Sequence, residues 1–227
     1  MKIAVIVAMQ KEMALMEPML EDAERTKIIG HPVLTGKIGN HEVALMQCGI
    51  GKVNAALGAS YLIDMFHPDL IVNSGVAGGA SKKVHPLSVV VAETVAYHDV
   101  WCGPGTPYGA AADMEVELSA DSDALQAARR LPASADALFG LVCSGDKFIS
   151  KASEVQQIRE EFPDVLAVDM ESGAIAQTCY LRGVPFFVVR VISDTPGEAD
   201  NISQYQNFWV DAPTETFRFL KELINEL

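Results

Sequence analysis

A chain of 227 residues with 49% hydrophobic residues is long enough for one α/β domain with a substantial core. Its net charge of −13, without a basic run, argues against nucleic-acid binding, and no apolar stretch reaches membrane-spanning length. The four cysteines are scattered without a C-x-x-C pair and no signal peptide opens the chain, so we expect a cytoplasmic protein without metal or cofactor.

Apolar, β-branched runs alternate with helical patterns along the chain. The predicted strands are Ile3–Met9, His31–Ile38, His41–Cys48, Leu70–Asn73, Leu87–Ala92, Phe139–Ser144 and Pro185–Ile192. The predicted helices are Lys11–Leu20, Val53–Met65, Ser153–Glu160, Ser172–Arg182 and Phe208–Leu227. This alternation predicts a three-layer α/β/α sandwich around a mixed, mostly parallel central sheet, formed by residues 1–227 as a single domain.

Turn residues mark the connections between these elements. Gly39-Asn40 separates two strand patterns and predicts a hairpin. The segments Val100–Met114 and Thr195–Asn207 are rich in glycine, proline or polar residues, and we expect irregular loops that cover a binding site.

Three acidic residues follow predicted strands, which is where ligands bind in α/β sheets. Glu12 follows the first strand, Glu171 enters a predicted helix, and Asp194 closes the last strand. Each carboxylate has an alternative structural role, because an acid in a first helical turn can cap free N–H groups. Together they favour a shared site with carboxylate chemistry.

Two glycine-rich segments follow strands, at residues 48–52 and 73–79. Their backbone amides can approach a ligand closely, although a tight turn from strand to helix explains each segment equally well. Neither matches a P-loop or a dinucleotide-binding fingerprint. His98 is the histidine nearest to these segments, and a structural role suits it better than contact with a substrate.

The order of several motifs resembles the purine nucleoside phosphorylase and nucleosidase superfamily, in its branch of 5′-methylthioadenosine/S-adenosylhomocysteine nucleosidases. The resemblance covers nearly the whole chain. The motifs are Ala8–Glu12 (AMQKE), Gly49–Ala56 (GIGKVNAA), Asn73–Gly79 (NSGVAGG), Tyr97–Asp99 (YHD), Ser144–Ile149 (SGDKFI), Val168–Glu171 (VDME) and Arg190–Asp194 (RVISD). The implied activity is hydrolysis of the N-glycosidic bond of these nucleosides, releasing adenine and the 5-thio-substituted ribose.

The resemblance also implies roles for individual residues. Glu12 would activate the attacking water, Asp194 would protonate adenine at N7, and Arg190 would help to place the water and the carboxylates. Ser193 would orient Asp194, while Met170 and Glu171 would hold the ribose. The remaining implied contacts are Phe148 and Ile149 with adenine, Met9, Ile50 and Val76 with the ribose and 5′ side, and Tyr205 or Phe208 as the aromatic of the lid.

Three segments depart from the family pattern, and all surround the 5′ substituent or the entrance. Val76 stands where many relatives have Ser or Thr, the segment Val100–Gly109 is shortened, and Thr195–Glu198 replaces the usual residues after the acid. The exact nucleoside therefore stays open, and 5′-deoxyadenosine and aminodeoxyfutalosine are alternatives to the two thio-nucleosides.

Two other classes of function remain as alternatives. A phosphorylase must hold a phosphate dianion, usually with arginines near the glycine-rich loops, and no arginine lies in those loops. Lys52 is the only nearby cation. A nucleoside-binding protein without activity would not need both an acid and a base. We expect a small-molecule nucleoside as ligand and a homodimer, because relatives complete the 5′ pocket with a partner's loop and Val100–Tyr108 is apolar.

Overall fold

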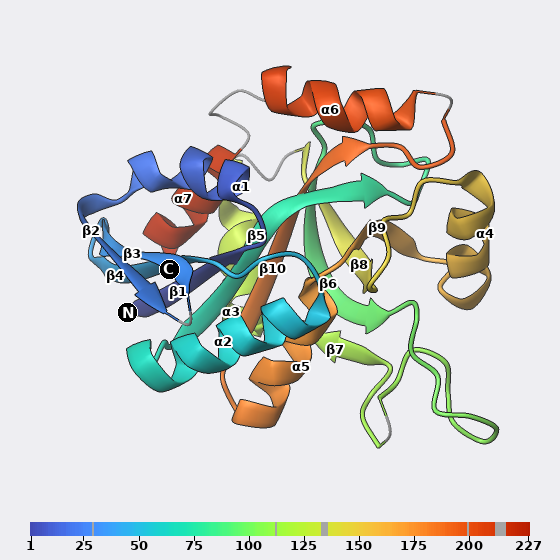
Figure 1. The fold of residues 1–227 in the computed structure, drawn as a ribbon, viewed down its shortest axis with the longest axis horizontal. Coiled ribbons are helices and arrows are strands. Elements are labelled where there is room, and N and C mark those ends of the chain that lie inside the picture. The colour runs from blue at the N-terminus through green and yellow to red at the C-terminus, as the bar shows by residue number, and fades with distance from the viewer. Residues whose placement is uncertain (29, 112, 133–135, 199, 212–216) are drawn as a thin grey trace.

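The computed structural model of the chain is built on one sheet of ten strands with helices packed around it (Figure 1). It describes residues 1–28, 30–111, 113–132, 136–198, 200–211 and 217–227. The strands are β1 Lys2–Val7, β2 Glu21–Ile28, β3 His31–Ile38, β4 His41–Gln47, β5 Leu70–Gly79, β6 Val89–Tyr97, β7 Glu117–Ser119, β8 Leu138–Ser144, β9 Val165–Asp169 and β10 Phe186–Asp194. The helices are α1 Gln10–Met16, α2 Lys52–Phe66, α3 Ser122–Arg130, α4 Ala152–Glu161, α5 Ser172–Arg182, α6 Asn201–Asp211 and α7 Arg218–Glu226.

The sheet is mixed, as the sequence predicts. Strands β4, β1, β5 and β10 run parallel in that order, while β2, β3 and β4 form an antiparallel meander. Beyond β10 the chain pairs through β6, β8 and β9 and returns to β5, where Gly78 pairs with Val168. Five strands, β5, β10, β6, β8 and β9, therefore close into a ring next to the open part of the sheet.

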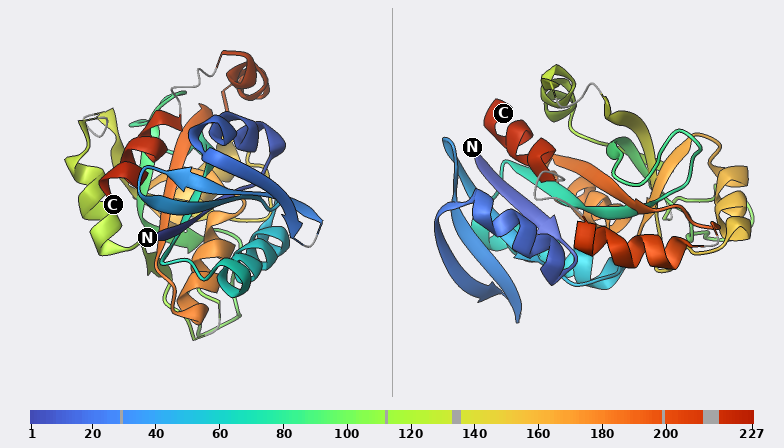
Figure 2. Two further views of the ribbon diagram at one scale, coloured as in Figure 1. Left: turned by 90° about the vertical axis from the view of Figure 1, so that its left-hand side faces the viewer. Right: turned by 90° about the horizontal axis from the view of Figure 1, so that it is seen from above.

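Helices cover the sheet, and the described residues form three apolar clusters. Ala55 and Leu62 of α2 pack in one cluster with Ile175 of α5. The second holds residues of α1, α3 and α7, and the third includes residues of α4. Both chain termini lie on the same side of the molecule (Figure 1 and Figure 2). The parallel strands point their carboxyl ends towards the segments that carry the acidic residues.

The structure corrects several predicted elements. The C-terminal helix predicted at Phe208–Leu227 is two helices, because α6 ends at Asp211 and α7 begins at Arg218, and α6 already begins at Asn201 inside a segment predicted as a loop. The strand predicted at Leu70–Asn73 continues through the glycine-rich segment to Gly79. Pro18 ends the first helix early, in a 3₁₀ turn over Glu17–Met19.

The predicted hairpin is confirmed, and some elements were not predicted. The hairpin at Gly39-Asn40 joins β3 and β4, in which Ile38 pairs with His41. Strands β2, β7 and β9 and helix α3 had no counterpart in the sequence prediction. No helix among the described residues is both long and apolar enough to cross a bilayer. Cys48, Cys143 and Cys179 are buried free thiols, and the described residues contain no cluster of His, Cys, Asp or Glu suited to a metal ion.

Candidate active site

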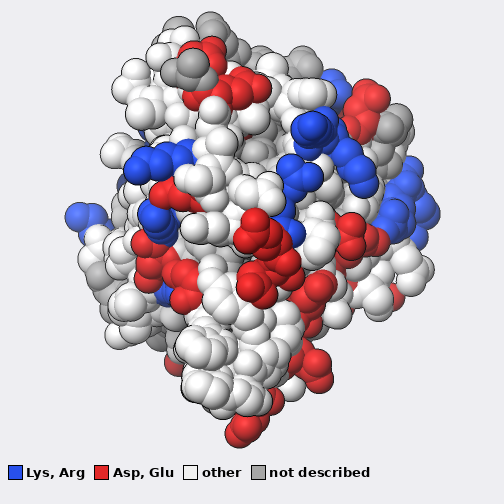
Figure 3. Space-filling model, turned by 90° about the vertical axis from the view of Figure 1, so that its right-hand side faces the viewer, with Lys and Arg blue, Asp and Glu red and all other residues white. Residues whose placement is uncertain are grey.

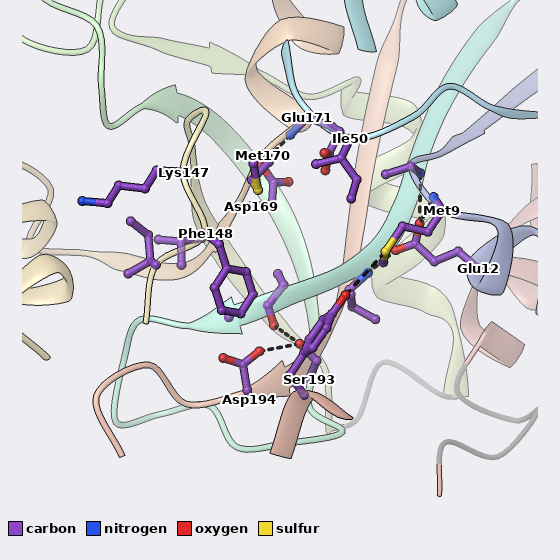
Figure 4. A pocket seen from close by; sticks show the side chains of 17 residues that line it. Met9, Glu12, Ile50, Lys147, Phe148, Asp169, Met170, Glu171, Ser193 and Asp194 are labelled. Atoms are coloured by element: carbon purple, nitrogen blue, oxygen red, sulfur yellow. Dashed lines mark hydrogen bonds between the residues drawn. The ribbon is translucent and has the colours of Figure 1, made fainter. Parts of the chain in front are cut away.

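One cavity collects most of the residues that the sequence analysis selected. It encloses about 600 Å³ of empty space, its open mouth included. Glu12, Glu171 and Asp194 approach it from three sides (Figure 4). It is also lined by the other predicted contacts Met9, Ile50, Val76, Phe148, Ile149, Met170, Ser193 and Tyr205.

Glu12 is buried at the start of α1 and is held by three backbone donors. Its Oε2 accepts hydrogen bonds from the N–H groups of Ala8 (2.9 Å) and Met9 (2.8 Å), so it does cap this helix. Its Oε1 accepts a third from the N–H of Val76 on β5, at 3.0 Å. Burial raises the pKa of Glu12 above its usual value, against these hydrogen bonds and the charge of Arg190.

Asp194 ends β10 and is almost completely buried. Ser193 Oγ lies 2.6 Å from its Oδ1, and Asn201 Nδ2 donates to its Oδ2 at 3.2 Å. Burial raises the pKa of Asp194, and the hydrogen bonds from Ser193 and Asn201 oppose that rise. Ser193 Oγ also lies 3.3 Å from the carbonyl oxygen of Ala77. A protonated Asp194 satisfies this chain fully, because it then donates to Ser193 while the hydroxyl donates to Ala77.

Glu171 lies at the amino end of α5 but does not cap it with its side chain. Its Oε1 instead accepts a hydrogen bond from the N–H of Gly51, at 2.8 Å, in the segment before α2. Burial, followed by the charge of Asp169, raises the pKa of Glu171 to about 7. The cap of α5 comes from Asp169, whose Oδ1 accepts from the N–H and the hydroxyl of Ser172.

Arg190 lies behind the cavity and does not line it. Its Nε donates to Asp169 Oδ2 at 2.8 Å, and its terminal nitrogen donates to Asn73 Oδ1. The arginine is 1% exposed and Asp169 is 7% exposed, so removing either partner would leave an uncompensated buried charge. Arg190 therefore braces β9 and β5 beneath Glu171, and its charge still reaches Glu12 and Glu171.

The aromatic side chains define the mouth of the cavity. The Phe148 ring meets Tyr205 of α6 edge to face, with 5.5 Å between the ring centroids, and the Tyr205 hydroxyl lies 3.5 Å from Met9 Sδ. Phe208 is buried against Trp209 and does not line the cavity. Of the two candidates for the lid, Tyr205 is the one at the site.

The cations near the site already have acidic partners. Lys147 is the one lysine or arginine among the described residues that line the cavity, and its ammonium pairs with Glu154 at 2.7 Å. Lys52 pairs with Asp99 at 2.6 Å and lies over the Tyr97 ring. His98 is buried outside this cavity.

Three contributors to the site escaped the sequence analysis. Asp169, Asn73 and Asn201 hold Arg190 and Asp194 in place. Asp169 and Asn73 lie in two of the motifs, Val168–Glu171 and Asn73–Gly79, but nothing in the sequence pairs them with Arg190. Asn201 carries no signal of its own, since its partner is set by the fold.

Comparison with known proteins agrees with this geometry. A model of the phosphorylase superfamily matches residues 2–225. The 5′-methylthioadenosine/S-adenosylhomocysteine nucleosidase of Geobacillus thermodenitrificans is 38% identical, over 89% of this chain and 88% of the relative. That of Desulfotalea psychrophila is 34% identical over 100% and 98% of the two chains.

Solved structures show the same likeness. The S-adenosylhomocysteine nucleosidase of Streptococcus pyogenes in complex with 5-methylthiotubericidin has a TM-score of 0.95 and 33% identity, over 100% of this chain and 97% of the other. The nucleosidase of S. pneumoniae with the transition-state inhibitor MT-ImmA has a TM-score of 0.94 and 30% identity, over 100% and 99%.

Proposed function

The chain belongs to the phosphorylase superfamily and, within it, to the 5′-methylthioadenosine/S-adenosylhomocysteine nucleosidases, and we propose that it hydrolyses the N-glycosidic bond of these two nucleosides. The products are adenine and the 5-thio-substituted ribose. One observation carries the proposal: two buried carboxyl groups with raised pKa values, Glu12 and Asp194, face one cavity from different sides (Figure 4).

Asp194 acts as the general acid in this proposal. As the bond between C1′ and N9 breaks, its electron pair moves to adenine, and the Asp194 proton passes to N7 so that a neutral base departs. A positioned acid of this kind contributes about 10²–10⁴-fold in rate. The raised pKa of Asp194 and its hydrogen-bond chain through Ser193 to Ala77 support a proton resting on this carboxyl.

Glu12 acts as the general base. Water attacks C1′ as positive charge develops on the sugar, and the carboxylate of Glu12 accepts the water's proton. Three backbone N–H groups fix the orientation of this carboxylate, which supports a role that depends on geometry. After the products leave, Glu12 releases the water's proton to solvent and Asp194 regains a proton from solvent.

The remaining lining residues hold the substrate. We propose that Glu171 accepts hydrogen bonds from the ribose hydroxyls, beside Met170, and that adenine lies between Phe148 and the Ile149 backbone near Asp194. Met9, Ile50 and Val76 face the ribose and the 5′ substituent, and Tyr205 covers the entrance. Arg190 positions Glu171 through Asp169 and contributes charge to the site.

Water is the favoured nucleophile over phosphate. A dianion needs cations directed into the cavity, usually arginines with free N–H groups. Arg190 does not line the cavity and is bonded behind it to Asp169, Asn73 and the carbonyl oxygen of Val189, and Lys147 is paired with Glu154. Val76 adds no hydroxyl at the position that faces Glu12.

We also propose a homodimer of single-domain subunits, each a three-layer α/β/α sandwich over residues 1–227. The exposed side chains Val53, Leu57 and Tyr61 form an apolar stripe along α2, at the spacing of one helix face. Trp101, in the loop Val100–Tyr108, is 57% exposed. On the side where this loop projects, residues other than Lys, Arg, Asp and Glu gather over the lower part of the surface (Figure 3). The exposed apolar side chains of α2 and of this loop support an interface.

A direct assay tests the proposed function. The protein is incubated with methylthioadenosine, adenosylhomocysteine, 5′-deoxyadenosine and aminodeoxyfutalosine, each with and without phosphate, and free base and sugar are quantified. Equal release of adenine in both buffers, with free methylthioribose as the second product, is the expected result. A ribose 1-phosphate, or turnover that requires phosphate, would contradict it.

A further inference from the structure

We propose that Asn201 is a positioning residue for the reaction, whose side-chain amide orients the carboxyl group of Asp194 and stabilises its ionised form once the proton has left. The proposal rests on the proposed function, in which Asp194 is the acid. It assigns a task to the first residue of α6, which lies in the segment Thr195–Asn207 that was predicted as a loop.

When Asp194 is ionised, its two oxygens have separate donors. Ser193, its neighbour on β10, donates to Oδ1, whereas Asn201 donates to Oδ2 from a different element. Asn201 is 5% exposed and Asp194 is 1% exposed, so no bulk water replaces this donor. Without Asn201, Oδ2 would be a buried acceptor that lacks its donor, which disfavours the ionised carboxylate.

Helix α6 is fixed at this end by more than one contact. Gln204, one turn after Asn201, accepts a hydrogen bond from the N–H of Thr195 at 2.9 Å, which ties the helix to the residue that follows Asp194. Tyr205, on the same face, reaches Met9 and Phe148 at the mouth of the cavity. The helix that closes the cavity thus also supplies the donor to the acid.

Several ionisable groups surround Asp194, so the effect of Asn201 must be separated from theirs. Tyr205 faces it from α6, and Glu12 of α1 and Glu171 of α5 line the same cavity, as does Lys147 before α4. None of these groups donates a hydrogen bond to Asp194 among the described residues; Ser193 and Asn201 do. Loss of the Asn201 donor raises the pKa of Asp194, while loss of a merely structural contact leaves that pKa unchanged.

The experiment compares two substrates over a range of about pH 5 to about pH 9. One is methylthioadenosine, whose base must be protonated to leave. The other is the 4-nitrophenyl riboside with the same 5′-methylthio group, whose leaving group needs no proton. With each substrate, kcat/KM is measured as a function of pH. A fall of kcat/KM at high pH (the alkaline limb) that appears only with methylthioadenosine reports the loss of the proton from Asp194, because Glu12 and Glu171 serve both substrates.

Asn201→Ala should lower kcat for methylthioadenosine roughly tenfold or more, less than the ~10²–10⁴-fold loss expected when the acid itself is removed. The acid's alkaline limb should move to higher pH, and cleavage of the nitrophenyl riboside should change little. The matched control is Asn207→Ala, an exposed asparagine on the same helix, which should match the wild type with both substrates. Asn201→Asp keeps the shape but replaces the donor by a second carboxyl group, so its limb should move further in the same direction.

The outcomes separate the inference from the proposed function. If the wild type releases no adenine, the proposed function fails. If the wild type is active but the limb stays in place in Asn201→Ala, or both substrates slow equally, Asn201 has no role through Asp194. If Asn201→Ala does not fold, Asn201→Asp gives the same test: an alkaline limb at higher pH supports the role of Asn201, and an unchanged limb contradicts it.

Discussion

A Cβ atom on Gly75 would lie 2.5 Å from Oε1 of Glu12, so the carboxylate occupies the space that any other residue's side chain would fill. Gly75 also has a φ of 151°, which side chains rarely adopt. Gly75→Ala should therefore displace the carboxylate and lower kcat by roughly 10²-fold, the usual effect of a misplacement of about 1 Å. Steady-state kinetics with methylthioadenosine measure this.

The control for Gly75 is Gly30→Ala. Gly30 has a φ of 83° but nothing within 4 Å of the added Cβ, so the control carries the backbone strain without the collision. Its kcat should match the wild type. Equal activity of Gly75→Ala and the wild type would mean that the position of Glu12 does not limit the reaction.

Glu12→Gln should nearly abolish turnover and leave the affinity for adenine largely intact, because an amide cannot accept the water's proton. The amide also places its own N–H₂ against one of the backbone donors, so we expect a loss of about 1–3 kcal/mol in the free energy of unfolding. Single-turnover rates, adenine binding by calorimetry and urea unfolding measure the three effects. A loss of affinity at unchanged kcat would mean that Glu12 only binds.

Glu171 should couple both stability and binding to pH. Its pKa rises from 4.5 to about 7 on folding, mainly because of burial. Folding therefore favours its protonated form, and the stability that it contributes is complete below about pH 4.5 and is lost as the pH rises through about 7. In thermal scans, the Tm of Glu171→Gln should therefore fall less than that of the wild type as the pH rises from about 4.5 to about 7.

The substrate should respond in the opposite sense. Only the ionised Glu171 accepts hydrogen bonds from two ribose hydroxyls, so KM of the wild type should rise as the pH falls below about 7. Glu171→Gln should show a defect in both KM and kcat, because ribose contacts serve the ground and transition states. Tm curves of the two proteins that run parallel, together with a KM independent of pH, would disprove the role.

The sequence predicts the side chains that line the cavity better than the residues that hold those side chains in place. The three acids, Ser193 and the aromatic Phe148 were found because they lie at strand ends or in motifs. Gly75 was seen only as part of a glycine-rich segment, although its absent side chain makes room for a carboxylate. The partners of Arg190 lie 21 and 117 residues away along the chain, a relationship that local patterns do not contain.

The fold shows the same division. Helix α5 was predicted with its observed bounds, because its apolar pattern ends at Gly183, which adopts the left-handed conformation of a C-cap. Strand β2 was missed because its side chains are exposed on both faces and show no alternation; pairing with β3 holds it in place. Strand β9 was missed because it has only five residues and lies directly before the start of α5.

The apolar stripe on α2, formed by Val53, Leu57 and Tyr61, should determine the oligomeric state. Leu57→Glu places a charge in the middle of the proposed interface, so light scattering at micromolar concentration should give a dimer for the wild type and a monomer for the variant. Leu87→Glu, at a leucine of similar exposure outside α2 and the loop Val100–Tyr108, should stay dimeric. A fully active wild-type monomer would rule out the interface.

The central claim is that Asp194 passes a proton to N7 of adenine as the bond breaks. It is tested most directly by single-turnover cleavage of methylthioadenosine and its 7-deaza analogue, by the wild type and by Asp194→Asn. The variant retains the size of the side chain and a hydrogen-bond donor but has no proton to transfer, and the analogue has no atom to receive one. We expect each change alone to reduce the rate by roughly 10²–10⁴-fold, and both together to reduce it no further, since they remove one interaction. Normal cleavage of the 7-deaza analogue by the wild type, or full turnover by Asp194→Asn, would contradict the account.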